Sequence, residues 1–156
     1  VVREHFNFKS INKKNIETSK IMQSCNSVSI HIRRGDYLNL PNYCVCDEEY
    51  YRCAIKHICE NVDKPVFYVF SNEPDWCESF MQQFGVVFKI INWNQRGDSY
   101  QDMYLMTQCK HNIIANSTFS WWGAWLNNKA DKIVVAPHVW FKNNNYNINC
   151  PGWHLI

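Results

Sequence analysis

Residues 28–37 read Val28-Ser29-Ile30-His31-Ile32-Arg33-Arg34-Gly35-Asp36-Tyr37. The first five alternate in character and are rich in β-branched side chains, which predicts a strand. His31 and Arg33 are expected on one side of that strand, and Arg34 on the opposite side unless the strand ends there. Gly35 then permits a turn that few other residues tolerate, so two adjacent arginines are expected at the end of the strand.

Helices and strands alternate around this segment. Short apolar runs predict four more strands, at residues 66–70, 86–91, 113–115 and 132–136. Caps and periodicity predict helices at 11–24, from Asp47, from Asn72 or Glu73, at 99–109 and at 117–127. The β-α-β-α-β-α-β-α-β order, with short connections, predicts an α/β fold with a mostly parallel sheet and helices on both faces.

Several details of these helices are specific expectations. The helix that Asp47 caps is expected to bury one side, made of Tyr50, Tyr51, Ala54, Ile55 and Ile58. The first helix offers Ile11, Ile21 and Met22 as inward positions. Ser99 and Asp102 have the spacing of a capping box, and Gly85 is expected to stop the helix that has Pro74 in its first turn.

Length and composition limit the possible classes of protein. The 156 residues predict one domain, residues 1–156, and the formal charge of +2 is too small to indicate nucleic acid as a partner. No run of 18 apolar residues occurs, so no transmembrane segment is expected in this chain. The sequence begins at Val1, without an initiator Met or a signal-peptide pattern, so we expect it to be part of a longer protein.

Eight cysteines allow disulfides, a metal site or free thiols. Cys44-Val45-Cys46 is a C-x-C pattern without a second pair, which is unlike structural zinc sites. Cys53, Cys59, Cys77 and Cys109 fall in predicted helices, where a buried thiol packs as a small hydrophobe. Free thiols in a reducing compartment are favoured, and disulfide and metal interpretations stay open.

Arg33 and Arg34 point to an anionic ligand. Two adjacent arginines at the end of a buried strand are costly unless an anion neutralises them. The planar guanidinium suits a phosphate or diphosphate, because it grips two oxygens at once. The alternative is that the arginines pair with protein carboxylates such as Asp36 or Asp102.

A second anion-binding feature follows the predicted strand at 113–115. Asn116, Ser117 and Thr118 stand at a predicted helix N-terminus, where free N–H groups and hydroxyls bind anions. The alternative is an ordinary N-cap by Ser117. The same triplet matches an N-glycosylation site, which we discount because the segment is expected to be buried. Trp121, Trp122 and Trp125 are expected to pack in the core more readily than to form a sugar platform.

Metal use is not expected. Enzymes that hold a divalent cation for glycosyl or phosphoryl chemistry need closely spaced carboxylates on a loop. No Asp-x-Asp occurs here, and the nearest pattern is Glu73-Pro74-Asp75, which also suits a helix N-terminus. With paired arginines available, the charge on a leaving diphosphate needs no metal.

These motifs resemble those of the α-1,2-fucosyltransferase family. The segment from His31 to Tyr37 resembles the family's first hallmark motif, and the segment from Asp102 to Leu126 its second, in the same order and spacing. Residues 69–76 resemble a further family segment, in which Asn72 and Glu73 stand where two aspartates are common. The resemblance covers roughly residues 20 to 140.

The resemblance implies transfer of L-fucose from GDP-β-L-fucose to the 2-OH of a galactose-terminated glycan, with inversion to an α-linkage. It also implies a Rossmann-like domain, the carboxyl-terminal half of a two-domain GT-B architecture that holds the nucleotide sugar. The amino-terminal, acceptor-side domain is absent from this chain. GDP-fucose is then the donor substrate, and no cofactor is implied.

The same resemblance distributes roles among the site residues. Arg33 and Arg34 would bind the leaving diphosphate, and Asn116, Ser117 and Thr118 would lie at its oxygens. Glu73 and Asp102 would contact guanine, ribose or the arginines. Asp36 and His31 are the titratable groups of the first motif that could take the acceptor proton, although His31 is also suited to a structural role and Asp36 to orienting an arginine.

Two other classes of function stay open. One is a GDP- or glycan-binding fragment that is inactive without the amino-terminal half, and the other is a thiol- or metal-binding structural domain. For an active enzyme, the expected location is the cytoplasm or the cytoplasmic face of a membrane in a bacterium, or the Golgi lumen in a eukaryote.

Overall fold

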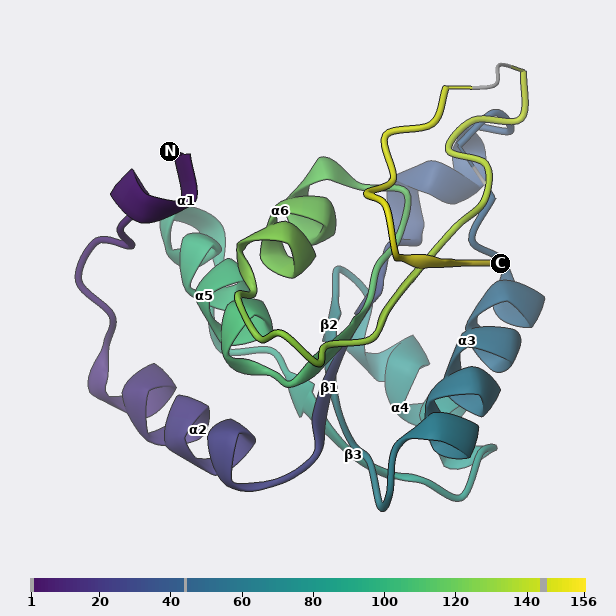
Figure 1. The fold of residues 1–156 in the computed structure, drawn as a ribbon. Coiled ribbons are helices and arrows are strands. Elements are labelled where there is room, and N and C mark those ends of the chain that lie inside the picture. Colours follow the sequence, from purple (N-terminus) through teal and green to yellow (C-terminus); the bar gives the residue numbers. More distant parts are fainter. Residues whose placement is uncertain (1, 44, 144–145) are drawn as a thin grey trace.

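The computed structural model describes residues 2–43, 45–143 and 146–156, and within these ranges six strands form one sheet (Figure 1). The strands are β1 (Ser27–Ile32), β2 (Val66–Ser71), β3 (Val87–Ile91), β4 (His111–Ile113), β5 (Val134–Ala136) and β6 (His154–Leu155). Their order is β3-β2-β1-β4-β5-β6, and every neighbouring pair is parallel. The predicted α/β fold, Rossmann-like with a parallel sheet, is confirmed.

Helices cover both faces of the sheet (Figure 1). The described helices are α1 (Val2–His5), α2 (Lys13–Ser24), α3 (Glu48–Asn61), α4 (Pro74–Gln82), α5 (Tyr100–Gln108) and α6 (Thr118–Leu126), with short 3₁₀ turns at Gly35–Asn39 and Arg96–Asp98. Packing of α3 and α4 on Val28, Ile30 and Phe67 forms the core of one face. On the opposite face, α2 and α5 pack on Tyr68 and Phe70, and α6 packs beside α5 over β5.

The strand register places the ends of β1, β2 and β4 side by side. Ile30 is paired with Val69 on β2 and with Ile113 on β4, and Ile32 is paired with Ser71. The order of the strands reverses between β1 and β4, which is where doubly wound sheets open a crevice at their carboxyl edge. The loops after β1 and β4 carry the two motifs that the sequence singles out.

The helix from Asp47 forms as predicted. The Asp47 carboxylate accepts a hydrogen bond from the backbone N–H of Tyr50 at 2.9 Å, which caps α3. Its buried residues are the five expected ones: Tyr50, Tyr51, Ala54, Ile55 and Ile58. The hydroxyls of Tyr50 and Tyr51 donate to the backbone carbonyls of Ile114 and His31 at 2.6 and 3.0 Å. These two bonds tie α3 to the loop after β4 and to the end of β1.

Two local predictions are wrong. The fourth strand is His111–Ile113 rather than 113–115, because the Asn112 amide is satisfied inside the protein by Ser29 Oγ and by the Met106 carbonyl. Ser99 makes no capping bond through its side chain, since its backbone is already helical where the 3₁₀ turn at 96–98 runs into α5. The sequence pattern also missed β6, which extends the sheet beside β5.

The inward face of α2 is polar, which corrects another expectation. Its buried residues are Asn15, Thr18, Ser19 and Met22, at helical spacing along one stripe. Ile21 is 55% exposed and Ile11 is half-buried outside the helix, so of the three expected inward residues only Met22 is buried. Polar groups at these positions are satisfied by hydrogen bonds, which a hydrophobic pattern does not register.

The described cysteines, at positions 25, 46, 53, 59, 77, 109 and 150, are free thiols, as expected, and Cys44 lies outside the described residues. Cys77 and Cys109 are buried. Cys59 is exposed and Cys53 half-buried, so these two do not pack as core hydrophobes. In the described ranges no helix is both long and apolar enough to span a bilayer.

Candidate active site

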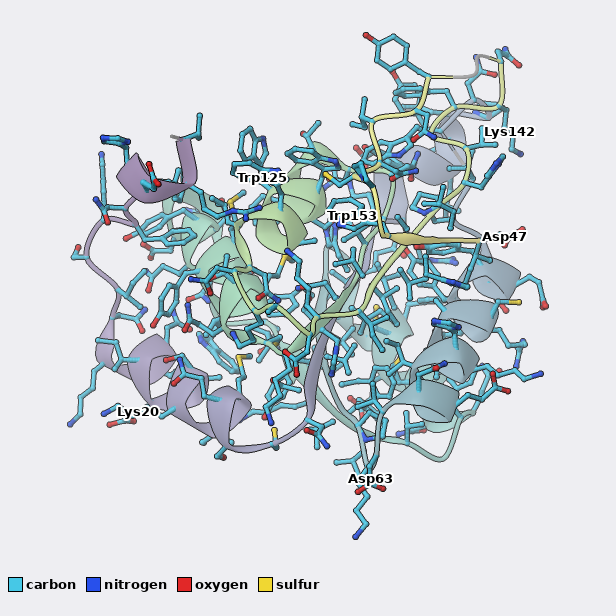
Figure 2. All side chains as sticks on the ribbon, viewed as in Figure 1. Lys20, Asp47, Asp63, Trp125, Lys142 and Trp153 are labelled. Carbon is cyan, nitrogen blue, oxygen red and sulfur yellow. The ribbon has the colours of Figure 1, made fainter. Side chains whose placement is uncertain are left out.

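Residues that follow β1, β2 and β4 line one cavity at the carboxyl edge of the sheet. Its volume is about 280 Å³. Four of the nine candidate site residues line it, namely His31, Arg33, Asp102 and Ser117, together with Ser71, Asn72, Ser99 and Phe119. We call it the donor cavity. The other edge of the sheet, where the strands begin, is marked by Asp63, which precedes β2 and lies far below Asp47 in Figure 2.

Arg33 is held at the mouth of the donor cavity with one nitrogen unused. Its Nη2 donates to Asp36 Oδ2 at 2.8 Å, and its guanidinium lies 5.2 Å from the centre of the Tyr37 ring. Arg33 Nε is buried and has no hydrogen-bond partner among the described residues. A buried N–H without a partner is costly, so this atom is suited to an anionic ligand in the cavity.

Asp36 forms an ion pair with Arg33. The hydrogen bond from Arg33 is the largest cause that lowers the pKa of Asp36, so this carboxylate is ionised at neutral pH. The expected pairing of an arginine with Asp36 is therefore present. The other carboxylate that the sequence offered, Asp102, accepts instead from Asn94.

Arg34 pairs with a different carboxylate, and because β1 ends at Ile32 the strand alternation does not fix its direction relative to Arg33. Its Nε donates to Glu73 Oε2 at 3.1 Å, and its guanidinium lies 3.7 Å from the centre of the Trp76 ring. Its backbone N–H donates to Asn72 Oδ1 at 3.1 Å. Both arginines line a second cavity of about 230 Å³ between the donor cavity and α3. Glu73 thus contacts an arginine.

Gly35 makes this arrangement possible. Its φ is +50°, and an added Cβ would lie 2.5 Å from the Asn72 amide nitrogen. A residue with a side chain would be strained by the backbone and would displace Asn72. The glycine therefore lets the loop after β1 lie against the loop after β2.

His31 lies at the base of the donor cavity with a neutral ring. It is 7% exposed, its Nδ1 has no partner among the described residues, and its ring lies 5.8 Å from that of Phe119. Burial, followed by the charge of Arg33, lowers the pKa of His31 to about 3. An imidazole of this kind is a weak base at pH 7, so the geometry favours hydrogen bonding over proton abstraction.

Asp102 reaches the same cavity from α5. Burial raises its pKa to about 6, and the hydrogen bond from Asn94 opposes that rise. Asn94 Nδ2 donates to Asp102 Oδ1 at 2.8 Å, while Asn15 Nδ2 on α2 donates to Asn94 Oδ1 at 2.7 Å and to Gln101 Oε1 at 2.8 Å. Asn15 is fully buried.

Sequence reasoning missed Asn15 and Asn94. The signal that points to Asn15 is the polar stripe at positions 15, 18, 19 and 22 of α2, which repeats with the helical period. Nothing local marks Asn94, because its partners lie on two other elements, at Asn15 and Asp102.

The loop after β4 brings the second motif to the cavity. Ser117 is the N-cap of α6, but its side chain makes no capping bond, so the ordinary capping interpretation is wrong. Ser117 lines the donor cavity and Thr118 is exposed beside it. Asn116 is 4% exposed, as expected for a segment discounted as a glycosylation site, and its Nδ2 donates to the carbonyls of Tyr43 and Trp140.

The expected core packing of the α6 tryptophans holds for Trp121, which packs against a core cluster, but not for Trp122 and Trp125. The residues that α6 buries are small or aliphatic, namely Ser120, Gly123, Ala124 and Leu126. A Cβ on Gly123 would lie 2.9 Å from Met106 Cβ, so close packing on α5 excludes larger residues. Trp122 is 38% exposed, and Trp121 and Trp125 are half-buried with parallel rings 6.0 Å apart. Figure 2 labels Trp125, which belongs to α6, and Trp153, whose ring lies 6.0 Å from that of Trp121.

No group of three or more His, Cys, Asp or Glu side chains within residues 2–43, 45–143 and 146–156 is arranged to hold a metal ion.

Comparison with known protein families now identifies the chain. Residues 1–156 match the family model described as "Glycosyl transferase family 11". The chain belongs to glycosyl transferase family 11.

Members of family 11 from bacteria and from mammals resemble this chain. It is 43% identical over 139 residues to the Escherichia coli O-antigen biosynthesis glycosyltransferase WbnK, covering 86% of this chain and 45% of the relative. Identity to the Escherichia coli alpha-1,2-colitosyltransferase is 38% over 150 residues, covering 94% and 52%. Identity to human galactoside alpha-(1,2)-fucosyltransferase 1 is 34% over 103 residues, covering 64% and 28%.

The chain thus spans about half the length, or less, of these family 11 relatives. Among solved structures, it resembles that of POFUT1 in complex with GDP-fucose, with a TM-score of 0.50 at 12% identity. The match covers 79% of this chain and 46% of that one. At this identity the likeness concerns the fold alone.

Proposed function

We propose that this family 11 chain binds GDP-β-L-fucose and supports transfer of L-fucose to the 2-OH of a galactoside, with inversion to an α-1,2 linkage. The observation that carries the proposal is the buried, unpartnered Nε of Arg33 at the donor cavity. The names of the relatives, which include an alpha-1,2-colitosyltransferase and alpha-(1,2)-fucosyltransferases, and the GDP-fucose complex of POFUT1 support the donor and the linkage.

The diphosphate is assigned to the space between Arg33 and the start of α6. Arg33 is bonded to Asp36 and has a buried Nε without a partner among the described residues, while α6 begins at Ser117, whose hydroxyl makes no capping bond to the N-terminal N–H groups. A fixed guanidinium and a helix N-terminus both stabilise charge that grows as the diphosphate leaves. Thr118 is the next hydroxyl along, and Arg34 adds positive charge from the adjoining cavity.

The nucleoside is assigned to the donor cavity beside Asp102. Guanine presents two neighbouring N–H donors on one edge, and an ionised carboxylate accepts from both. Asn94 holds Oδ1 of Asp102, and a pKa of about 6 leaves the carboxylate ionised at pH 7. The rings of His31 and Phe119 supply flat surface in the same cavity.

The proposed step exchanges one bond for another. The bond from fucose C1 to the β-phosphate oxygen breaks, the electron pair leaves with GDP, and the acceptor oxygen bonds to C1 from the opposite face. The acceptor proton passes to a base. We assign Asp36 to holding Arg33 and His31 to hydrogen bonding, which places the proton acceptor among other groups of the whole protein.

We propose that the reaction needs no divalent cation, because Arg33 and Arg34 supply the positive charge that a metal supplies elsewhere. We also infer that this chain is the carboxyl-terminal, donor-binding half of a GT-B enzyme, with the acceptor side in the rest of the protein. The Escherichia coli relatives support a bacterial-type enzyme of the cytoplasm or the cytoplasmic face of the membrane. A galactose-terminated glycan is the proposed acceptor.

Isothermal titration with GDP, GDP-fucose, GMP and UDP tests the donor assignment. Arg33→Ala is expected to weaken GDP binding about a hundredfold while leaving guanosine binding within about twofold. Arg52→Ala is the matched control, since Arg52 is an arginine on α3 with an exposed ion pair to Glu49. Equal losses for GDP and guanosine, or no GDP binding by the folded wild type, would refute the diphosphate site.

A second candidate function is a GDP-binding module that does not catalyse transfer. It is favoured by the state of the two titratable groups of the first motif, because burial lowers the pKa of His31 to about 3 and Asp36 is paired with Arg33. Transfer of fucose to lactose, measured for this chain and for the whole protein, discriminates the two: GDP binding without turnover in both supports the module.

A further inference from the structure

An aromatic pocket lies next to the donor cavity, on the other side of the α6 N-terminus. Its volume is about 350 Å³, within the range of small-molecule sites. Its walls include Tyr37, Tyr43, Trp140, Phe141, Ser117 and Thr118. The Tyr43 ring lies 5.5 Å from the ring of Tyr37 and 5.1 Å from that of Phe141, centre to centre. We call this the aromatic pocket.

The aromatic pocket adjoins the donor cavity. Ser117 lines both, and Arg33, which lines the donor cavity, lies over Tyr37, which lines the aromatic pocket. The group that Arg33 and Ser117 hold therefore has the donor cavity on one side and the aromatic pocket on the other. A sugar nucleotide has the same order: a nucleoside, a diphosphate and a pyranose.

The walls of the aromatic pocket are fixed before any ligand binds. The buried Asn116 amide donates to the carbonyls of Tyr43 and Trp140 at 2.9 and 3.0 Å, which joins the loop after η1 (Gly35–Asn39) to the loop after β5. Trp140 Nε1 donates in turn to Asn149 Oδ1 at 3.1 Å. Rigid aromatic side chains bind with little loss of conformational freedom.

The chemistry of the two cavities separates the base from the sugar. The lining residues of the aromatic pocket, taken from the described chain, are uncharged, whereas the donor cavity contains the Asp102 carboxylate. Guanine needs a carboxylate or similar acceptor for its N–H donors, and a pyranose does not. A pyranose offers a face of C–H groups to aromatic rings and hydroxyls to groups such as Ser117 and Thr118.

We propose that the aromatic pocket binds a pyranose ring, and that this ring is the sugar of the donor nucleotide. The assignment rests on the proposed function, because it takes the diphosphate from there. It makes Tyr43 and Phe141 contact residues for the transferred sugar. An apolar wall at this place also suits the methyl group of a 6-deoxy sugar such as fucose.

The test is the ratio of the dissociation constants for GDP-fucose and GDP, measured by titration in Tyr43→Ala. Loss of the ring is expected to weaken GDP-fucose about tenfold more than it weakens GDP, which touches Tyr43 only through the second cavity. Tyr43→Phe keeps the ring and is expected to bind both ligands like the wild type. Trp122→Ala is the matched control, because Trp122 is also 38% exposed but lies outside the pocket. Thermal unfolding of each variant verifies folding, and Phe141→Ala repeats the test from the opposite wall.

Other outcomes overturn the placement in distinct ways. Equal weakening of GDP and GDP-fucose would put the base in the aromatic pocket. A higher KM for lactose with unchanged GDP-fucose affinity would assign the ring to the acceptor. If the wild-type protein is folded but binds no GDP, both the proposed function and the sugar site in the aromatic pocket are wrong. If the wild type binds GDP and both Tyr43→Ala and Phe141→Ala keep the wild-type affinity for GDP-fucose, only the placement of the sugar in the aromatic pocket is wrong.

Discussion

Asn94 links a residue of the first helices to a carboxylate in the donor cavity: its amide bonds Asn15 on one side and Asp102 on the other, at 2.7 and 2.8 Å. The indole N–H of Trp93 donates to Asn15 Oδ1 at 2.8 Å, and Gln101 accepts from Asn15. Each buried amide in this network is satisfied, so the Asp102 carboxylate is held in one orientation. Helix α2 therefore helps to position a carboxylate of the donor cavity, although Asn15 and Asp102 are far apart in the sequence.

Guanosine binding is expected to weaken as the pH falls below about 6. Asp102 has a pKa of about 6, and only its ionised form accepts from both N–H groups of guanine. Each pH unit below that value is expected to reduce the affinity about tenfold. Guanosine is the right probe because it carries no titrating phosphate, and the measurement is a titration series from about pH 8 to about pH 5.

Asp102→Asn is expected to bind guanosine weakly and without this pH dependence. Asp131→Asn, an exposed carboxylate on the loop before β5, is expected to keep the wild-type profile. A pH profile that persists in Asp102→Asn would assign the titration to another group.

Asn15→Ala is expected to destabilise the protein by about 3 kcal/mol, because it removes the partners of Asn94 Oδ1 and of the Trp93 indole N–H. Urea unfolding measures the change. Asn128→Ala removes an exposed asparagine and is expected to alter stability by less than about 0.5 kcal/mol. Similar values for the two variants would show that the network contributes nothing to stability.

Local patterns predicted the sheet and the two motifs well, and missed what depends on distant contacts. The alternation at 28–32 and the caps at Asp47 and Glu73 are properties of neighbouring residues, so they are visible in the sequence. Asn15 and Asn94 are 79 residues apart, and no short window contains both.

The aromatic pocket also depends on contacts between residues that are far apart in the sequence. Tyr43 and Phe141 meet because Asn116 bonds both of their loops and because the Lys142 backbone N–H donates directly to the Asn42 carbonyl. The pairing of Arg34 with Glu73 likewise depends on the register of β1 and β2. Residue types alone left open whether the arginines face a ligand or a carboxylate, and the structure has both arginines paired while one nitrogen of Arg33 stays unused.

Gly35→Ala is expected to cost stability and GDP affinity together. The backbone φ of +50° is strained for alanine, and the new Cβ would displace Asn72, which accepts the Arg34 N–H. Gly85→Ala is the matched control, since Gly85 also has a positive φ, of +62°, but its Cβ would meet no atom within 4 Å. Gly85→Ala is expected to lose about 1 kcal/mol and no GDP affinity.

For Gly35→Ala we expect a loss of about 3 kcal/mol in urea unfolding and a GDP affinity at least about tenfold lower. Equal stability losses in the two variants would show that Asn72 moves aside without cost.

His31 is expected to make the fold sensitive to acid. Its pKa is about 3 in the folded protein and near 6.5 in the unfolded chain, so below pH 6.5 the unfolded chain binds a proton that the folded protein does not. The contribution of His31 to the free energy of unfolding is therefore fully present above about pH 6.5. It falls by about 1.4 kcal/mol per pH unit as the pH drops toward 3. Asp102 acts in the opposite sense, because its raised pKa stabilises the protonated folded form between about pH 4 and about pH 6.

The effects of His31 and Asp102 on stability thus nearly cancel between about pH 4 and about pH 6. Replacing either residue is expected to leave the pH dependence of stability that the other residue causes. Urea midpoints of His31→Gln are expected to rise as the pH is lowered from about 6 to about 4, and those of Asp102→Asn to fall over the same range. His138→Gln, which replaces an exposed histidine, is expected to follow the wild type. Parallel pH profiles in His31→Gln and the wild type would show that the His31 imidazole is protonated in the folded protein, and its proposed part as a neutral hydrogen-bonding group at the donor cavity would then be wrong.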